Sequence, residues 1–432
     1  MGRWARVIPD CSAKTQGMRT DTEIGGATMR AMKTGARPVL FGAFDRHNFG
    51  DLLFPHLLAA LLPDQRFVFR GLAARDLRRF GGHRVRPLAS GSPHLVHVGG
   101  ELLTCSAWQA AVMLRDAGET DALVARYDAH PADAAKWAAD QLGTTRTMPY
   151  VAGRALLAPK GKLIFNAVGG VEWHALTPGQ REEVKNALEA ADWLSVRDHV
   201  TQDALRRDGV VATLCPDPAV MLRQCFGARL EARARGGAVR AVRAAFPQGY
   251  LACQFSGDFA DEASLDALAG GLGDAAATSG LGIVLFRAGA APWHDDLALY
   301  EKVRARLPPG RGRLFTSLHV WDICALIAAS RGTIASSLHA RIAALAFALP
   351  RVSLRKPQAD SGQPDKVAAF AETWEPEGLP HGVVPAEIGT ATARALATPV
   401  GVLHDNTEAV CAACRASVAH WAGLLGATRL GQ

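Results

Sequence analysis

The chain has 432 residues, of which 49% are hydrophobic and 21% are charged, and its formal net charge is +7. This length exceeds one ordinary hydrophobic core and predicts two domains, while the composition excludes a disordered or fibrous chain. A modest excess of positive charge fits an acidic substrate. Since no run of Lys and Arg is interleaved with aromatic residues, we expect no nucleic-acid partner.

The N-terminal segment 1–36 contains no apolar stretch of signal-peptide length, so we expect a disordered leader there and order from Arg37. The longest apolar run, 342–350, is far shorter than the ~20 residues that span a bilayer. We therefore expect no integral membrane segment, and only a peripheral membrane contact stays open. The eight cysteines are scattered without a disulfide framework, which indicates a reducing compartment, the cytoplasm.

The first part of the ordered chain alternates short apolar runs with helical patterns. Strands are expected at 38–44, 66–70, 94–100, 162–170, 193–197 and 210–215, and helices at 51–62, 178–191 and 198–209. Because alternating strands and helices build parallel sheets covered by helices, this pattern predicts an N-terminal Rossmann-like domain over 37–222.

A second α/β series follows a basic, Gly/Ala-rich break at 223–248. Its strands are expected at 250–255, 281–286 and 313–317, and its helices at 261–279 and 294–306. It predicts a C-terminal Rossmann-like domain over 249–364, followed by a helical tail, 365–432, that packs back on the N-terminal domain. The expected fold class is α/β, with two doubly wound domains facing each other across a ligand-binding cleft.

Residues 331–354 carry the strongest functional signal. They predict a strand at 333–335, a tight turn and a helix over 337–349 that Pro350 stops. Ser336 and Ser337 form the turn, and Ser337 is a good N-cap; His339 and Arg341 follow within about one turn. Free amides, an imidazole and a guanidinium together predict an anion site at this helix start.

Other strand exits add polar candidates. The segment GAFDRHNFGD (42–51) supplies His47, Asn48 and Asp51, and its spacing is that of neither a P-loop nor a dinucleotide fingerprint. Arg197 stands where a strand becomes a helix, and Asp217 lies between two prolines. Each has a structural alternative, since Asp51 could be a helix cap and Arg197 a salt-bridge partner.

Two glycine pairs end strands in equivalent places. Gly99-Gly100 is followed by Glu101, and Gly169-Gly170 is followed closely by Glu172. Glycine lets a ligand or a helix approach the backbone closely. We therefore expect the two pairs to form two walls of one cleft.

Taken in this order, the motifs GAFDRHNFGD, the Gly-Gly exits, SVRD, PDPAV and SSLHARIAALAFALPRV give the chain a resemblance to the polysaccharide pyruvyl transferase family, from about Pro38 to Leu354. The resemblance implies a two-domain GT-B fold. It also implies transfer of the enolpyruvyl group of phosphoenolpyruvate to a sugar as a ketal, in polysaccharide or exopolysaccharide biosynthesis. The implied partners are phosphoenolpyruvate as donor and a sugar or lipid-linked oligosaccharide as acceptor, with no cofactor and no metal.

The resemblance and the residue chemistry together assign roles. His339 would supply a proton, and Arg197 and Arg341 would clamp the phosphate and carboxylate. The candidate bases are Asp51, Glu101, Glu172 and Asp217. The other candidate substrate-binding residues are Ser336, Ser337, His47, Asn48, Gly99, Gly100, Glu101, Gly169, Gly170 and Glu172.

One residue departs from the family pattern. Family members often carry an Arg before Leu-His, where this chain has Ser337. We expect Arg341 or Arg331 to substitute for it, or the donor to bind differently.

Two other functions stay open. One is a nucleotide-sugar-dependent GT-B glycosyltransferase, against which the absence of any Glu between Arg331 and Arg355 argues, because such a carboxylate would hold the ribose. The other is a non-catalytic sugar- or anion-binding protein, which turnover would distinguish.

Overall fold

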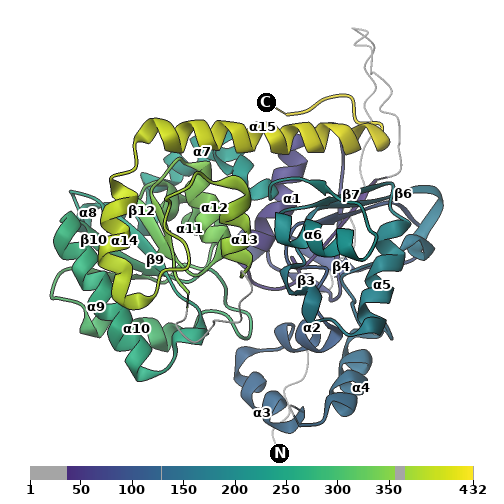
Figure 1. Ribbon diagram of the computed structural model, residues 1–432, viewed down its shortest axis with the longest axis horizontal. Helices are drawn as coiled ribbons and strands as arrows, with labels where there is room; N and C mark the ends of the chain where they lie inside the picture. Colours follow the sequence, from purple (N-terminus) through teal and green to yellow (C-terminus); the bar gives the residue numbers. More distant parts are fainter. Residues whose placement is uncertain (1–36, 128, 356–364, 432) are drawn as a thin grey trace, which may run out of the picture. The chain divides into compact units, whose positions relative to one another are not determined.

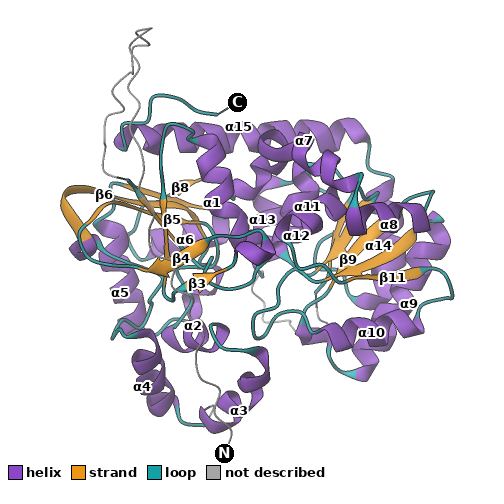
Figure 2. Cartoon of the chain, turned by 180° about the vertical axis from the view of Figure 1, so that it is seen from behind, coloured by secondary structure: helices purple, strands orange, loops and turns teal. Residues whose placement is uncertain are grey.

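The computed structural model describes residues 37–127, 129–355 and 365–431, and the expected leader, 1–36, lies outside them. Arg37–Gln432 form one compact unit that contains two β-sheets. Figures 1 and 2 show the strands in two separate groups, each packed among helices.

The first sheet has eight strands in the order β3-β4-β2-β1-β5-β6-β7-β8. Its strands are β1 (Val39–Phe41), β2 (Val68–Gly71), β3 (Arg75–Asp76), β4 (Arg84–Pro87), β5 (Ser92–Val98), β6 (Leu157–Val168), β7 (Trp193–Val196) and β8 (Thr213–Leu214). All neighbouring pairs are parallel except β3 and β4. Strand β1 is apolar along its whole length, and β5 and β6 are buried toward their carboxyl ends, because helices cover both faces of a parallel sheet.

Helices of this part of the chain are α1 (Phe49–Leu61), α2 (Ala107–Met113), α3 (Ala117–Tyr127), α4 (Pro131–Leu142), α5 (Pro178–Glu189) and α6 (His199–Arg207). Side chains at their starts accept hydrogen bonds from free amides: Asn48 caps α1, and Asp198 caps α6. The sequence did not predict α2–α4, whose Ala-rich segments lack a strong apolar stripe.

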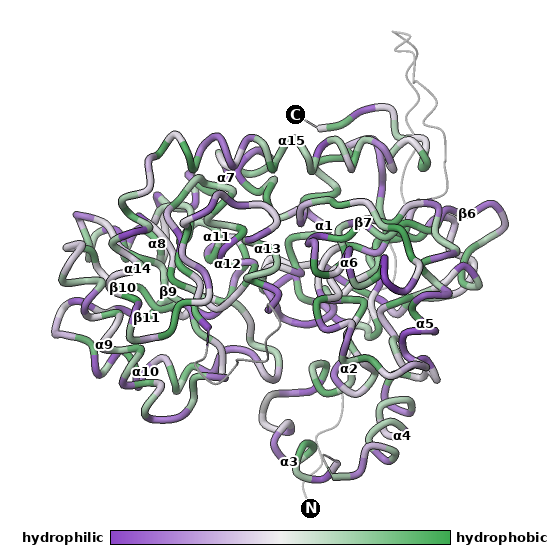
Figure 3. The backbone as a smooth tube through the Cα atoms, viewed as in Figure 1, coloured by the Kyte–Doolittle hydropathy of each residue, from purple (hydrophilic) through white to green (hydrophobic). Residues whose placement is uncertain are grey.

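The second sheet has five parallel strands in the order β11-β10-β9-β12-β13. They are β9 (Tyr250–Gln254), β10 (Gly282–Phe286), β11 (Gly312–Phe315), β12 (Gly332–Ala335) and β13 (Arg351–Ser353). The helices around it are α9 (Glu262–Ser279), α10 (Leu297–Arg306), α11 (Val320–Ala328) and α12 (Leu338–Ala346). Strand β9 is fully buried, and Figure 3 shows hydrophobic residues (green) in its middle.

The segment 223–248, predicted as a break between the two α/β series, is helical. It forms most of α7 (Leu222–Ala234) and all of α8 (Gly237–Ala245). These helices bury Leu230, Val239 and Val242 in the same core as α1 and α11. Two of the basic residues, Arg229 and Arg233, contact α11 at the edge of this core, over Trp321 and beside Asp322.

The C-terminal segment contains α13 (Lys366–Trp374), α14 (Ile388–Leu396) and the long α15 (Val400–Leu424). Helix α15 contacts β6, where Trp421 Nε1 donates to Asn166 Oδ1 at 2.9 Å. Cys411 Sγ donates to Val220 O at 3.3 Å. The domain boundaries at 222 and 249 remain a prediction.

None of the helices in the described ranges combines the length and the apolar character that crossing a bilayer requires.

Candidate active site

A cavity of about 1000 Å³ lies at the carboxyl ends of strands from both sheets. The first sheet contributes the segments after β1, β5, β6 and β7, and the second sheet contributes those after β9, β10 and β12. Ligands of open α/β sheets bind at this end of the strands. Of the predicted site residues, the following line the cavity: Asn48, Asp51, Gly100, Glu101, Glu172, Arg197, Ser336, Ser337 and His339.

His339 lies in the first turn of α12 and is 7% exposed. Its ring packs edge-on against Phe54 of α1, with 5.4 Å between centroids. A Cβ at Gly50 would lie 1.9 Å from His339 Cγ and 2.1 Å from Nδ1, so α1 must carry glycine there. The imidazole is therefore held between a helix of the first sheet and a helix of the second.

The other ring nitrogen of His339, Nε2, faces Asp217. It lies 3.5 Å from Asp217 Oδ2 and makes no hydrogen bond among the described residues. Asp217 is fully buried behind the cavity wall and does not line it. Burial favours the protonated carboxyl, but His339 and then Arg197 hold the pKa of Asp217 below its ordinary value.

Arg197 joins this pair from the first sheet. The side chain is 2% exposed; Nη1 lies 3.5 Å from Asp217 Oδ2, and Nη2 donates to Glu101 Oε2. Burial lowers the pKa of the guanidinium, yet the carboxylates of Glu101 and Asp217 raise it above its ordinary value. Nε is buried against Gly169 and has no partner among the described residues, so the hydrogen-bonding capacity of the guanidinium is incompletely used.

The glycine pairs do not form two facing walls. Because β5 and β6 are neighbours, the pairs lie side by side, and Gly169 N donates to Gly100 O at 2.8 Å. Gly99 and Gly170 do not line the cavity; a Cβ at Gly99 would lie 2.3 Å from Phe54 Cζ. These residues shape the packing behind the site.

Gly169 has a more specific structural role, although it does not line the cavity either. A Cβ there would lie 2.6 Å from Glu101 Oε2 and 2.8 Å from Arg197 Nε. Glu101 also accepts a hydrogen bond from Val171 N at 2.7 Å, which ties the two strand exits together. Glycine at 169 therefore leaves the space that the Glu101–Arg197 pair occupies.

Asp51 lies at the start of α1 and is 5% exposed. It is not the helix cap, because Asn48 Oδ1 accepts from Gly50 N at 3.2 Å and fills that role. Its charge acts on the guanidinium groups of Arg46 and Arg197. Asp51 is thus a cavity carboxylate beside two cations.

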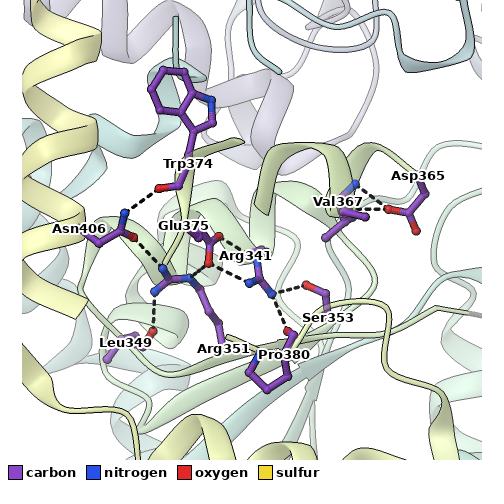
Figure 4. A network of polar contacts seen from close by, with 11 residues as sticks. Arg341, Leu349, Arg351, Ser353, Asp365, Val367, Trp374, Glu375, Pro380 and Asn406 are labelled. Carbon is purple, nitrogen blue, oxygen red and sulfur yellow. Dashed lines mark hydrogen bonds and ion pairs between the residues drawn. The ribbon is translucent and has the colours of Figure 1, made fainter. Parts of the chain in front are cut away.

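The expected ligand contact by Arg341 is wrong. Its side chain is 1% exposed and does not line the cavity, and it donates to both oxygens of Glu375 at 2.8 Å. Nη1 donates to Ser353 Oγ and Pro380 O, so the guanidinium has partners on every side. Figure 4 shows Arg341 and Arg351 converging on Glu375. Glu375, the partner of Arg341, directly follows helix α13 and lies 34 residues further along the sequence.

His47 also lies outside the cavity. Its Nε2 lies 2.8 Å from Leu318 O, and Nδ1 accepts from Ala290 N at 3.1 Å. Both ring nitrogens therefore bind backbone groups of the second sheet's loops, and the expected substrate contact by His47 is wrong.

The departure at Ser337 has a local explanation. Ser337 Oγ accepts from Ala340 N at 3.3 Å and caps α12, as the sequence predicts. Neither Arg331 nor Arg341 lines the cavity, so neither substitutes for the missing family Arg. Among the residues that the structure describes, the Arg and Lys side chains that line it are those of Arg46, Arg197, Arg355 and Lys366.

Several cavity residues were not predicted. Arg46 stacks on Tyr150 and donates to its hydroxyl at 2.9 Å, while its buried Nε has no partner among the described residues. Asp295 is 7% exposed, and burial raises its pKa to about 7. Arg46 lies inside GAFDRHNFGD and could have been singled out with its neighbours. Asp295 sits in a loop with no periodic signal.

The likeness to solved structures defines the class of fold. The S. aureus MnaA–UDP co-structure aligns with 91% of this chain and 98% of its own, at 12% identity and a TM-score of 0.53. An alpha,alpha-trehalose 6-phosphate synthase from Burkholderia multivorans aligns with 90% and 98%, at 14% identity and a TM-score of 0.46. A putative UDP-N-acetylglucosamine 2-epimerase from Listeria monocytogenes aligns with 91% and 98%, at 13% identity and a TM-score of 0.47. The predicted α/β class, with two doubly wound Rossmann-like domains in a GT-B-like fold, is confirmed.

A family model described as polysaccharide pyruvyl transferase matches residues 48–355. The match covers well over half of the sequence, so the chain belongs to the polysaccharide pyruvyl transferase family, as the motifs indicated. This is a family of transferases. A search of curated proteins finds no match to the chain.

Proposed function

We propose that the protein transfers the pyruvyl group of phosphoenolpyruvate to hydroxyls of a sugar in a polysaccharide or glycan precursor, forming a pyruvate ketal. Family membership supports this activity. The observation that carries it is the cluster of Arg197, Asp217 and His339, which combines an incompletely paired guanidinium with a carboxylate–imidazole pair at one cavity.

Donor binding would use the partnerless guanidinium donors. The Nε atoms of Arg46 and Arg197 are buried and lack partners among the described residues, and both residues line the cavity. A buried donor without a partner costs free energy that an anionic oxygen would recover. Phosphoenolpyruvate offers a phosphate and a carboxylate, and charge-assisted hydrogen bonds to such groups are among the strong ones.

Proton delivery would use His339. Protonation of the methylene carbon of phosphoenolpyruvate gives a methyl group and leaves C2 electrophilic. Asp217 faces Nε2, so it would orient the imidazole and stabilise its charged form, while Nδ1 delivers the proton.

Acceptor activation would use Asp51. As one sugar hydroxyl attacks C2, Asp51 would take its proton, and a bond from oxygen to C2 forms. A second hydroxyl then attacks C2, the bond to phosphate breaks, the departing phosphate takes the proton of that hydroxyl, and hydrogen phosphate leaves with the ketal complete. This reaction needs no cofactor. We propose a cytoplasmic location with it, since the described cysteines are all free thiols.

The test is a screen of sugars and lipid-linked oligosaccharides with phosphoenolpyruvate, followed by mass spectrometry for a pyruvyl ketal and by assay of phosphate. We expect acceptor-dependent phosphate release together with ketal. His339→Ala should lower turnover by roughly 10²-fold or more with the fold intact, as for loss of a general acid. A folded His339→Ala protein with normal turnover contradicts the assignment. Consumption of UDP- or GDP-sugars instead of phosphoenolpyruvate contradicts the function.

A further inference from the structure

The cavity wall contributed by the second sheet carries an exposed tryptophan. Trp293 lies between β10 and α10, lines the cavity and is 46% exposed. The other described large hydrophobic residues with comparable exposure lie outside the cavity; they are Val211, Val400, Val402 and Leu430. We propose that Trp293 forms an acceptor subsite by stacking against the apolar face of a sugar ring. This inference rests on the proposed function.

The backbone at Trp293 is strained. Its φ of 61° lies in the left-handed region, which is costly for a bulky residue. Such strain persists where the surrounding structure holds it, and it gathers at binding sites. The conformation points to a position kept for contact with a ligand, because the indole buries too little surface to explain it.

The loop that carries Trp293 is held at both ends. Ala288 N donates to Asp295 Oδ2 at 2.6 Å, and Asp295 N donates to Gly289 O at 3.3 Å. Within the loop, His294 N donates to Ala291 O at 3.1 Å. A loop closed on itself in this way presents its aromatic ring in a fixed place, which lowers the entropic cost of stacking.

The same loop is also fastened to the first sheet. Ala290 N donates to both His47 O and His47 Nδ1 at 3.1 Å, and Asn48 pairs with Gly289 in an isolated bridge. His47, which the sequence suggested as a ligand contact, therefore acts as a positioning residue for the tryptophan loop. The loop is set against the segment that carries Arg46 and Asp51, so an acceptor on Trp293 would enter the same cavity as the donor.

A carboxylate on the turn packed against the tryptophan loop favours a sugar over a flat aromatic ligand. Asp258 is exposed and lines the cavity, and a Cβ at Gly257 would lie 3.3 Å from His294 O. The turn at 257–258 thus lies against the tryptophan loop. An indole face packs against C–H groups, while a carboxylate accepts hydrogen bonds from hydroxyls. A sugar ring offers both kinds of group on one small surface.

The first experiment measures occupancy without turnover. Acrylamide quenching of tryptophan fluorescence is compared between wild type and Trp293→Phe, and the difference reports Trp293. We expect methyl glycosides of common hexoses, added without phosphoenolpyruvate, to protect Trp293 from quenching. Protection by none of the glycosides, or by UDP alone, overturns the inference.

The second experiment measures steady-state kinetics with the best acceptor of the ketal screen. Trp293→Ala should raise the acceptor KM by about tenfold, the loss of one aromatic stacking contact, and leave the donor KM unchanged. Trp293→Phe should restore most of the affinity, and the matched control Trp137→Phe, half-buried on α4 outside the cavity, should change nothing. An unchanged acceptor KM in Trp293→Ala overturns the inference.

The two proposals fail in different ways. Glycoside protection of Trp293 without ketal formation from phosphoenolpyruvate would contradict the proposed function and retain the sugar subsite. Ketal formation with normal acceptor KM in Trp293→Ala would retain the function and contradict the subsite.

Discussion

Two buried arginines, Arg197 and Arg341, meet carboxylates in this protein with opposite results. Arg341 is satisfied by Glu375, Ser353 and Pro380, and it lies outside the cavity. Arg197 pairs with Glu101, and its Nη1 lies 3.5 Å from Asp217 Oδ2. It lines the cavity, and its buried Nε has no partner among the described residues. Both look alike in sequence, as an Arg near a helix start. Their remaining hydrogen-bonding capacity separates a structural ion pair from a binding site.

The two clusters are connected through Trp374. Its Nε1 donates to the carbonyl of Arg197 at 2.7 Å, and its own carbonyl accepts from Asn406 Nδ2 at 2.6 Å (Figure 4). Asn406 Oδ1 in turn accepts from Arg351. Arg351, Arg341 and Glu375 form a closed cluster, in which the carboxylate pairs with both guanidinium groups. The closed cluster thus anchors Trp374, which holds the backbone of Arg197. Arg197 belongs to the open cluster at the cavity, together with Glu101, Asp217 and His339.

The largest expected effect concerns the closed cluster. Glu375→Ala should lower the free energy of unfolding by about 3–5 kcal/mol, because it leaves Arg341 and Arg351 buried without their counter-charge. Urea denaturation followed by circular dichroism measures this loss. The matched control is Glu372→Ala, which removes an exposed carboxylate from α13, the helix that ends just before Glu375. Equal stability of the two variants would show that the closed cluster does not hold the tail.

An intermediate effect concerns the open cluster. Gly169→Ala should lower turnover by about 10- to 10²-fold, because its Cβ displaces the Glu101–Arg197 pair and misplaced binding groups cost rate. The unfolding free energy should change little, since flexible side-chain ends can yield. Gly179→Ala on α5, where a Cβ meets nothing within 4 Å, is the control for steady-state kinetics. Normal turnover in Gly169→Ala would argue against a functional Glu101–Arg197 geometry.

The smallest effect concerns Asp295, a buried carboxyl whose hydrogen-bond donors are neutral groups such as Ala288 N and Gln254 Nε2. Burial raises its pKa from 3.8 to about 7, whereas the pKa of Glu375 is lowered, because Arg341 and Arg351 outweigh burial there. The folded state therefore keeps the proton of Asp295 up to a higher pH than the unfolded state does. Stability falls as the pH rises from 3.8 through about 7.

The pH dependence is therefore measurable. Stability should fall by about 1 kcal/mol between pH 6 and pH 8 on account of Asp295, and Asp295→Asn should remove that part of the slope. Urea denaturation of both proteins at the two pH values checks this. An identical slope in wild type and variant would mean that Asp295 is ionised throughout.

Much of the fold could be predicted because its signals are local. The run Thr333-Ile334-Ala335, the cap at Ser337 and the stop at Pro350 each reflect neighbouring residues, and β12 and α12 form there. Helix α12 ends at Ala346, earlier than predicted, and Ala348 takes a left-handed conformation before Pro350.

The site could be predicted only in part because its contacts join distant residues. His339 and Arg197 follow strands, and the carboxyl ends of strands are where ligands bind. Arg341 is kept from the cavity by its pairing with Glu375, and His47 by its hydrogen bonds to Ala290 and Leu318. Because these partners are distant in sequence, no local pattern predicts either contact. Trp293 stands in a polar loop whose role appears only when the cavity is assembled.

The most direct test of the open cluster is calorimetric titration of phosphoenolpyruvate, without acceptor, into wild type, Arg197→Lys and Arg341→Lys. Wild type should bind the donor, and folded Arg197→Lys should bind it at least tenfold more weakly, because Lys cannot reproduce the guanidinium fork. Arg341→Lys should lose stability and, where folded, retain donor affinity. Undiminished affinity in Arg197→Lys, or no binding by wild type, would contradict the account.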